Sequence, residues 1–141
     1  MMMNKKRWTS LFIKYGKEEA TDFLDTYRNA VPFQIISEPA EGLTMIKVRE
    51  HAENSLFYIG EMLVTETKIR QEQTVGLGVV KGSDRNLSMA VAFIDLCFSL
   101  DVLADELEQI LESLEMKEAA YIKERTQKIL KTKVDFDMMA E

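Results

Sequence analysis

The residues with the most promise for chemistry form a glycine-rich stretch, Gly76–Asp84, that runs into a helical pattern. A glycine-rich loop before a helix can hold a phosphate, because the backbone amides at the helix N-terminus point at the anion. The order differs from a P-loop, since Lys81 precedes Gly82, and a dinucleotide fingerprint needs glycine where Lys81 stands. We therefore expect Gly82 to make a turn and Ser83 or Asp84 to cap the helix, with anion binding by this turn as the alternative.

Two glycines, Gly76 and Gly78, interrupt a strand pattern just before this turn. Glycine has no side chain to pack in a strand, so the pair predicts a bulge or the close approach of another backbone. We interpret both glycines as candidate contacts with a partner, together with the apolar helix that follows at residues 87–100.

Asp95 is the single charged residue between Leu87 and Leu100. A carboxylate on such an apolar helix lies in the interior and has to be satisfied by hydrogen bonds or by a countercharge. We expect backbone amides, a basic side chain or a partner chain to do so. A role as general acid or base is the alternative, although Asp95 has no second acid or histidine beside it in the sequence.

The remaining reactive side chains are isolated from one another. His51 stands in a polar loop beside Glu50 and Glu53, and neither the spacing nor the number of ligands fits a metal site. Cys97 lies on the apolar helix without a base or cation to activate it, which predicts a core thiol. We expect this chain to contribute no catalytic residue, no cofactor site and no metal site.

Composition narrows the possible functions. The 141 residues are enough for one domain with a substantial core. The net charge of −6 repels nucleic acid, and no uncharged run is long enough to span a bilayer. One cysteine excludes an internal disulfide, and we place the protein in the cytoplasm. Residues 1–4 are expected to be disordered and residues 133–141 to form a tail.

The periodicity predicts an α+β fold. An N-terminal helical hairpin comprises Lys6–Tyr15 and a second helix that starts at Lys17 and ends before Val31. An antiparallel sheet of about four strands follows at 33–37, 43–49, 57–69 and 74–80, with a turn at 38–42. C-terminal helices then cover the sheet. The last one is long and repeats leucine and isoleucine at spacings of four and three, at Leu103, Leu107, Ile110 and Leu114.

The final segment alternates apolar residues with carboxylates, as in Asp135-Phe136. Apolar residues near a chain end dock on their own domain or add to the surface of another subunit, and both alternatives stay open here. Asp135 and Phe136 are therefore further candidate contacts.

Several short stretches in a fixed order resemble the PhnG family, a subunit type of the bacterial carbon-phosphorus lyase system for phosphonate breakdown. They span nearly the whole chain and are Arg7-Trp8, Glu38–Leu43 with the strand to Arg49, Gly60–Glu66, Val80–Asp84, Ala90–Asp95 and Lys133–Phe136.

The resemblance implies a core complex with PhnI-, PhnH- and PhnJ-like subunits. In that system the PhnI type, assisted by PhnG and PhnH types, displaces adenine from MgATP with a phosphonate. The carbon-phosphorus bond is cleaved later by the PhnJ type, which uses an iron-sulfur cluster and S-adenosylmethionine. The family assigns no catalytic residue to PhnG, so the resemblance implies a non-catalytic subunit. A free-standing binder of anions that uses Lys81–Asp84 is the alternative, and the isolated chain is a candidate for self-association.

Overall fold

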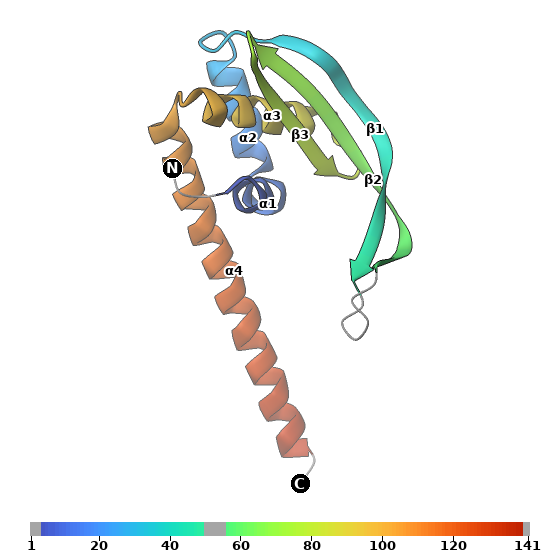
Figure 1. The fold of residues 1–141 in the computed structure, drawn as a ribbon. Coiled ribbons are helices and arrows are strands. Elements are labelled where there is room, and N and C mark those ends of the chain that lie inside the picture. Colours follow the sequence, from blue (N-terminus) through green and yellow to red (C-terminus); the bar gives the residue numbers. More distant parts are fainter. Residues whose placement is uncertain (1–3, 50–55, 140–141) are drawn as a thin grey trace.

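The computed structural model describes residues 4–49 and 56–139, and Figure 1 shows its order of elements. The α+β class and the N-terminal helical hairpin are confirmed. The elements are α1 (Lys5–Tyr15), α2 (Lys17–Tyr27), β1 (Gln34–Arg49), β2 (Leu56–Gln71), β3 (Thr74–Lys81), α3 (Arg85–Leu100) and α4 (Ala104–Met139). Asn4, expected among the disordered residues, caps α1 by accepting a hydrogen bond from the amide of Arg7 at 2.8 Å.

The sheet has three antiparallel strands in the order β1-β2-β3, one fewer than the expected number of about four. The segments at 33–37 and 43–49 and the turn between them merge into β1. Register shifts between Ile35 and Ser37 and between Ser37 and Ala40 accommodate the segment that contains Pro39. Because β1 is an edge strand, a proline without an amide hydrogen is tolerated there. The expected turn at 38–42 is therefore an irregularity at Pro39 within one strand, whereas Gly42 pairs in register with Val64.

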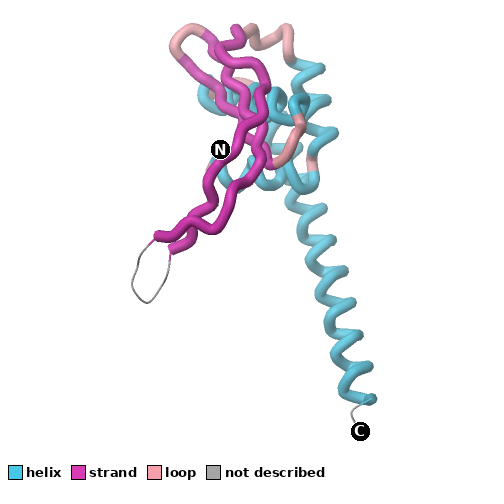
Figure 2. Tube along the Cα trace, turned by 90° about the vertical axis from the view of Figure 1, so that its right-hand side faces the viewer, coloured by secondary structure: helices cyan, strands magenta, loops and turns pink. Residues whose placement is uncertain are grey.

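Helix α3 is the centre of the core, which corrects its interpretation as a surface facing a partner. It lies across one face of the sheet, and α2 packs on its other side (Figures 1 and 2). Nine of its residues are buried. Phe93 contacts the rings of Phe23 and Phe33, each at a centroid distance of 5.7 Å. The apolar residues of α3 are therefore buried by other parts of this chain.

Gly76 and Gly78 allow the backbone of α3 to approach β3 closely. A Cβ atom on Gly76 would lie 2.8 Å from the Cβ of Leu96, and one on Gly78 would lie 2.6 Å from the amide nitrogen of Ala92. The predicted close approach is confirmed, and the approaching backbone belongs to this chain. Both glycines are buried on this face, so they are not exposed contacts for a partner.

A small polar cluster lies in the same interface between α3 and the sheet. The hydroxyls of Thr67 and Ser88 are 2.7 Å apart, and the Ser88 oxygen is 3.1 Å from the carbonyl oxygens of Thr65 and Gly78. The side chains of Thr65, Thr67 and Ser88 are fully buried. Buried hydroxyls cost stability unless they are hydrogen-bonded, so this network fixes the register of α3 on the strands.

Helix α4 packs against α1 along its first half. Leu107, Leu111 and Leu114 are at most 1% exposed, and Leu114 lies against Gly16 between α1 and α2. The guanidinium of Arg7 donates two hydrogen bonds to the Glu118 carboxylate, at 2.7 and 3.0 Å. Leu107 and Leu114 of the predicted seam are buried here, whereas Leu111 takes the place expected for Ile110, which is partly buried, and Leu103 precedes α4.

The second half of α4 projects away from the body, as Figures 1 and 2 show. Residues 133–139, which the sequence sets apart as a tail, continue this helix. Among the described residues, no helix combines the length and the apolar composition needed to cross a membrane.

Replacing Gly78 with alanine tests the contact between α3 and β3. The added methyl group meets backbone atoms that cannot move independently, so the Gly78→Ala variant should lose about 1–3 kcal/mol of unfolding free energy in urea denaturation. Gly42→Ala is the control, because a Cβ there meets nothing within 4 Å, and its change should stay within about 0.5 kcal/mol. Equal stability of the two variants would contradict the tight contact.

Titrating Glu118 tests the ion pair between α1 and α4. The hydrogen bonds from Arg7 lower the pKa of the Glu118 carboxyl, so the pair stabilises the fold above the ordinary glutamate pKa of about 4.3 and loses this effect as pH falls through the lowered pKa. Carboxyl NMR should show the Glu118 pKa rising in an Arg7→Gln variant. Lys128→Gln, which removes the exposed pair with Glu124, should leave it unchanged. An unchanged pKa in Arg7→Gln refutes the assignment.

Candidate functional site

The glycine-rich turn before α3 is held by hydrogen bonds within the chain. Gly82 has a φ of +85°, in the left-handed region that favours glycine. Its amide donates to the carbonyl of Leu63 at 2.8 Å, and its carbonyl accepts from the hydroxyl of Thr65 at 2.7 Å. The same hydroxyl accepts from the amide of Asp84 at 3.1 Å. The turn predicted at Gly82 is therefore confirmed.

Asp84 occupies the position at which an anion would bind the helix. Its carboxylate accepts a hydrogen bond from the amide of Leu87 at 3.0 Å, which confirms the predicted cap of α3. The hydroxyl of Ser83 donates to the carboxylate of Glu41 on β1. An incoming anion would meet the cation of Lys81 together with two carboxylates, an arrangement that offers little net attraction.

Asp95 connects three elements. Its Oδ2 accepts a hydrogen bond from the amide of Leu77 in β3 at 2.9 Å and another from Nζ of Lys5 in α1 at 3.0 Å. Lys5 also donates to the carbonyl of Leu77 at 2.9 Å. The expected backbone and basic partners are thus both present in this chain. The carboxylate fastens α1 to the junction of α3 and β3, a structural role that uses its hydrogen-bonding capacity.

The other candidate residues do not come together. Cys97 is fully buried in α3, and burial raises the pKa of its thiol to about 12, as expected for a core thiol. His51 lies outside the described residues. Asp135 and Phe136 belong to the last turns of α4, and their side chains also lie outside the description. Within residues 4–49 and 56–139, no three potential metal ligands are grouped.

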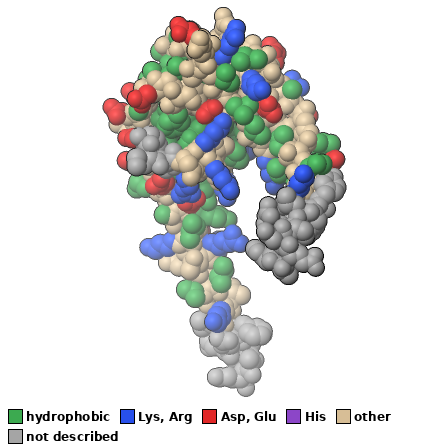
Figure 3. All heavy atoms as spheres, in the orientation of Figure 1, with side chains coloured by type: hydrophobic (Ala, Val, Ile, Leu, Met, Phe, Trp, Pro, Cys, Tyr) green, Lys and Arg blue, Asp and Glu red, His purple; other side chains and the backbone are tan. Residues whose placement is uncertain are grey.

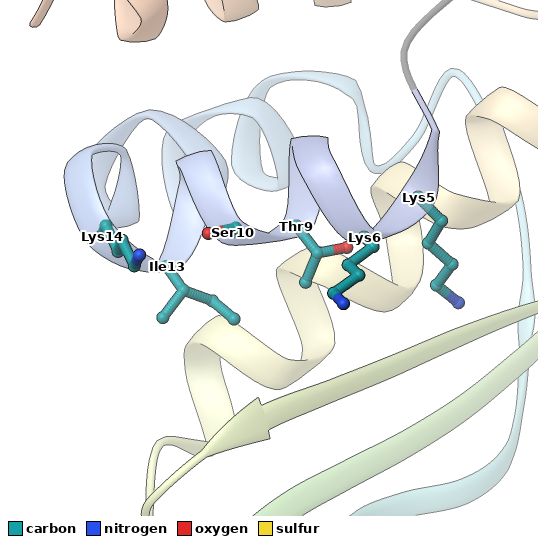
Figure 4. Close-up of a pocket in the computed structure, with 6 residues that line it drawn as sticks. All are labelled: Lys5, Lys6, Thr9, Ser10, Ile13 and Lys14. Carbon is teal, nitrogen blue, oxygen red and sulfur yellow. The ribbon is translucent and has the colours of Figure 1, made fainter. Parts of the chain in front are cut away.

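Figure 4 shows a shallow groove along α1. Its lining comes from a single helix and comprises Lys5, Lys6, Thr9, Ser10, Ile13 and Lys14. Lys5 is engaged with Asp95, and the residues that line the groove include neither a histidine nor a carboxylate. These groups do not form a nucleophile with a positioned base.

Large apolar side chains are exposed on the sheet, for example at Ile36 and Val75, and in two projecting parts of the chain. One is the projecting half of α4, where Tyr121, Ile122, Ile129 and Leu130 are 51–59% exposed. The other is the part of β1 and β2 beyond α3, where Leu43 pairs with Leu63 and both are exposed. In the sequence, Tyr121 follows Leu114 by seven residues, and Ile122 and Ile129 are also seven residues apart, which marks this part of the helix. Exposed apolar patches on a small protein mark interaction surfaces.

The described residues define a small α+β protein whose polar turn and half-buried carboxylate serve its own fold. Its exposed apolar side chains are typical of a surface that contacts another protein. The family model described as "Phosphonate metabolism protein PhnG" matches residues 3–141. The chain belongs to the PhnG family, as its motifs indicated, and its role lies in phosphonate metabolism. No curated protein matches the chain.

Two substitutions in the turn distinguish capping from anion binding. Asp84→Ala removes the cap and should lower the unfolding free energy by about 1 kcal/mol. Lys81→Ala should change it by less than about 0.5 kcal/mol, because Lys81 is exposed. Thermal unfolding with inorganic phosphate should show the same midpoint shift for the wild type and Lys81→Ala. A phosphate stabilisation that Lys81→Ala abolishes would instead support the anion-binding alternative.

Proposed function

We propose that this chain is a non-catalytic subunit of the carbon-phosphorus lyase core complex. In this role it assists a PhnI-type subunit in transferring a phosphonate to the ribose of MgATP with release of adenine. With methylphosphonate the product is ribose 1-methylphosphonate 5-triphosphate. The observation that carries the proposal is membership of the PhnG family across residues 3–141.

The distribution of polar and apolar groups supports a role in assembly. Ser83, Asp84 and Asp95 are engaged in hydrogen bonds within the domain, which supports a structural use of these polar groups. The exposed apolar residues of α4 and of the β1–β2 hairpin are the groups that gain most from contact with another subunit. In this role the chain contributes a surface that binds other subunits, and the reaction takes place on those subunits.

The cofactors of the proposed complex bind to the other subunits. MgATP binds at the PhnI-type subunit, and the iron-sulfur cluster with S-adenosylmethionine belongs to the PhnJ-type subunit. PhnH-like subunits complete the set of partners. Because MgATP is the co-substrate, we place the complex in the cytoplasm.

Co-expression tests this proposal. A tagged copy of the chain, produced with the PhnI-, PhnH- and PhnJ-like subunits of the same organism, should purify with them in a stoichiometric complex by pull-down and sizing. Release of adenine from MgATP and methylphosphonate should depend on the chain and fall to the background rate when it is omitted. The control omits the phosphonate. A chain that elutes alone as a monomer, beside folded partners, would rule out the assembly role.

A further inference from the structure

The packing face of α4 extends beyond the helix that covers it. In the first half, Leu107, Leu111 and Leu114 face the body of the protein at spacings of four and three, and Glu118 continues the row. The same spacing leads on to Ile122, Arg125, Ile129 and Thr132. Residues three and four apart lie on one face of a helix, so these four, here termed the α4 seam, continue the buried face.

The α4 seam lies beyond the reach of α1. The ring of Tyr121 contacts that of Tyr15, the last residue of α1, at a centroid distance of 6.1 Å. Past this contact, every side chain described from 122 to 133 is exposed, and Ile122 and Ile129 are 53% and 59% exposed. A shallow groove runs along this part of the helix, lined by Arg125, Lys128, Ile129, Thr132 and Lys133.

This half of α4 receives little stabilisation from the protein itself. Helices in proteins depend mainly on the burial of an apolar face, and here that face is open. The ion pair of Lys128 with Glu124 at 3.5 Å is 76% and 69% exposed, so it adds little. Covering the α4 seam would both bury its isoleucines and stabilise the helix that presents them.

The charge of the segment indicates what covers it. Residues 122–133 hold five basic residues and one acidic residue, a net charge of +4, whereas the whole chain carries −6. Figure 3 shows Lys and Arg side chains beside hydrophobic ones along the described part of the projecting helix. A surface that combines isoleucines with basic side chains complements one that combines apolar side chains with carboxylates.

We infer that the α4 seam docks against an apolar helix, flanked by aspartate and glutamate, on another subunit of the complex. This inference rests on the proposed role as a subunit. A helical partner suits the spacing of the α4 seam, which matches helix-to-helix packing. Among the side chains described, a second copy of this chain offers no such surface, because residues 122–133 of its projecting half are equally basic and the apolar face of its first half is covered by α1.

Matched substitutions in the co-expressed complex test the site. Ile129→Glu places a carboxylate on the α4 seam and should raise the dissociation constant by at least about tenfold. Gln127→Glu adds the same charge on the opposite face and should leave the constant within about twofold. Arg125→Glu should weaken assembly more than Lys131→Glu, a charge reversal off the α4 seam. All four positions are exposed, so circular dichroism should show unchanged helicity.

The outcomes separate this inference from the proposed function. A wild-type chain that fails to join its partners refutes the subunit role. A wild-type chain that assembles, with Ile129→Glu assembling equally well, refutes only the docking site. A dimer of the isolated chain that Ile129→Glu dissociates would assign the α4 seam to a second copy and likewise overturn the inference. Selective loss in Ile129→Glu and Arg125→Glu supports it.

Discussion

The close approach of two backbones, those of α3 and β3, is the constraint on which the rest of the structure depends. It requires positions without side chains, and Gly76 and Gly78 provide them. Once α3 lies this close to the sheet, its apolar residues are buried on both sides, by the strands and by α2. The hydroxyls of Thr67 and Ser88 then hydrogen-bond to each other, and Ser88 also bonds to a nearby carbonyl oxygen. Neither of these two buried hydroxyls is therefore unpaired.

Each further element is attached through this centre. Asp95 reaches from α3 to the amide of Leu77 and to Lys5, which fixes the start of α1. Helix α1 in turn presents Arg7 to Glu118 and, with its neighbours, covers the leucines of α4. The charged groups that first suggested chemistry thus act as connectors between elements. A carboxylate that accepts hydrogen bonds from both an amide and an ammonium group joins the elements that carry these donors.

The molecule consists of a packed body and two projecting parts that expose apolar side chains. In the body, the apolar side chains between α3, α2 and the sheet are covered and the polar groups of the turn are hydrogen-bonded, while Ile36 and Val75 on the sheet stay exposed. On the second half of α4 and on the β1–β2 hairpin beyond α3, apolar side chains are open to solvent. This division is physically consistent with a member of the PhnG family, whose role in phosphonate metabolism is proposed to depend on contact with other subunits.

The sequence by itself determined the local structure: the helical hairpin, the turn at Gly82, the cap at Asp84 and the need of Asp95 for partners. These depend on residue type and short-range spacing, which one segment contains in full. Only the tertiary contacts decide that the segment around Pro39 stays within one edge strand, that Gly76 and Gly78 face α3 of the same chain and that the leucines of α4 lie on α1. The physical reason is that periodicity identifies an apolar face but not what covers it. The same spacing is buried at Leu111 and exposed at Ile129, because α1 reaches the first residue and ends before the second.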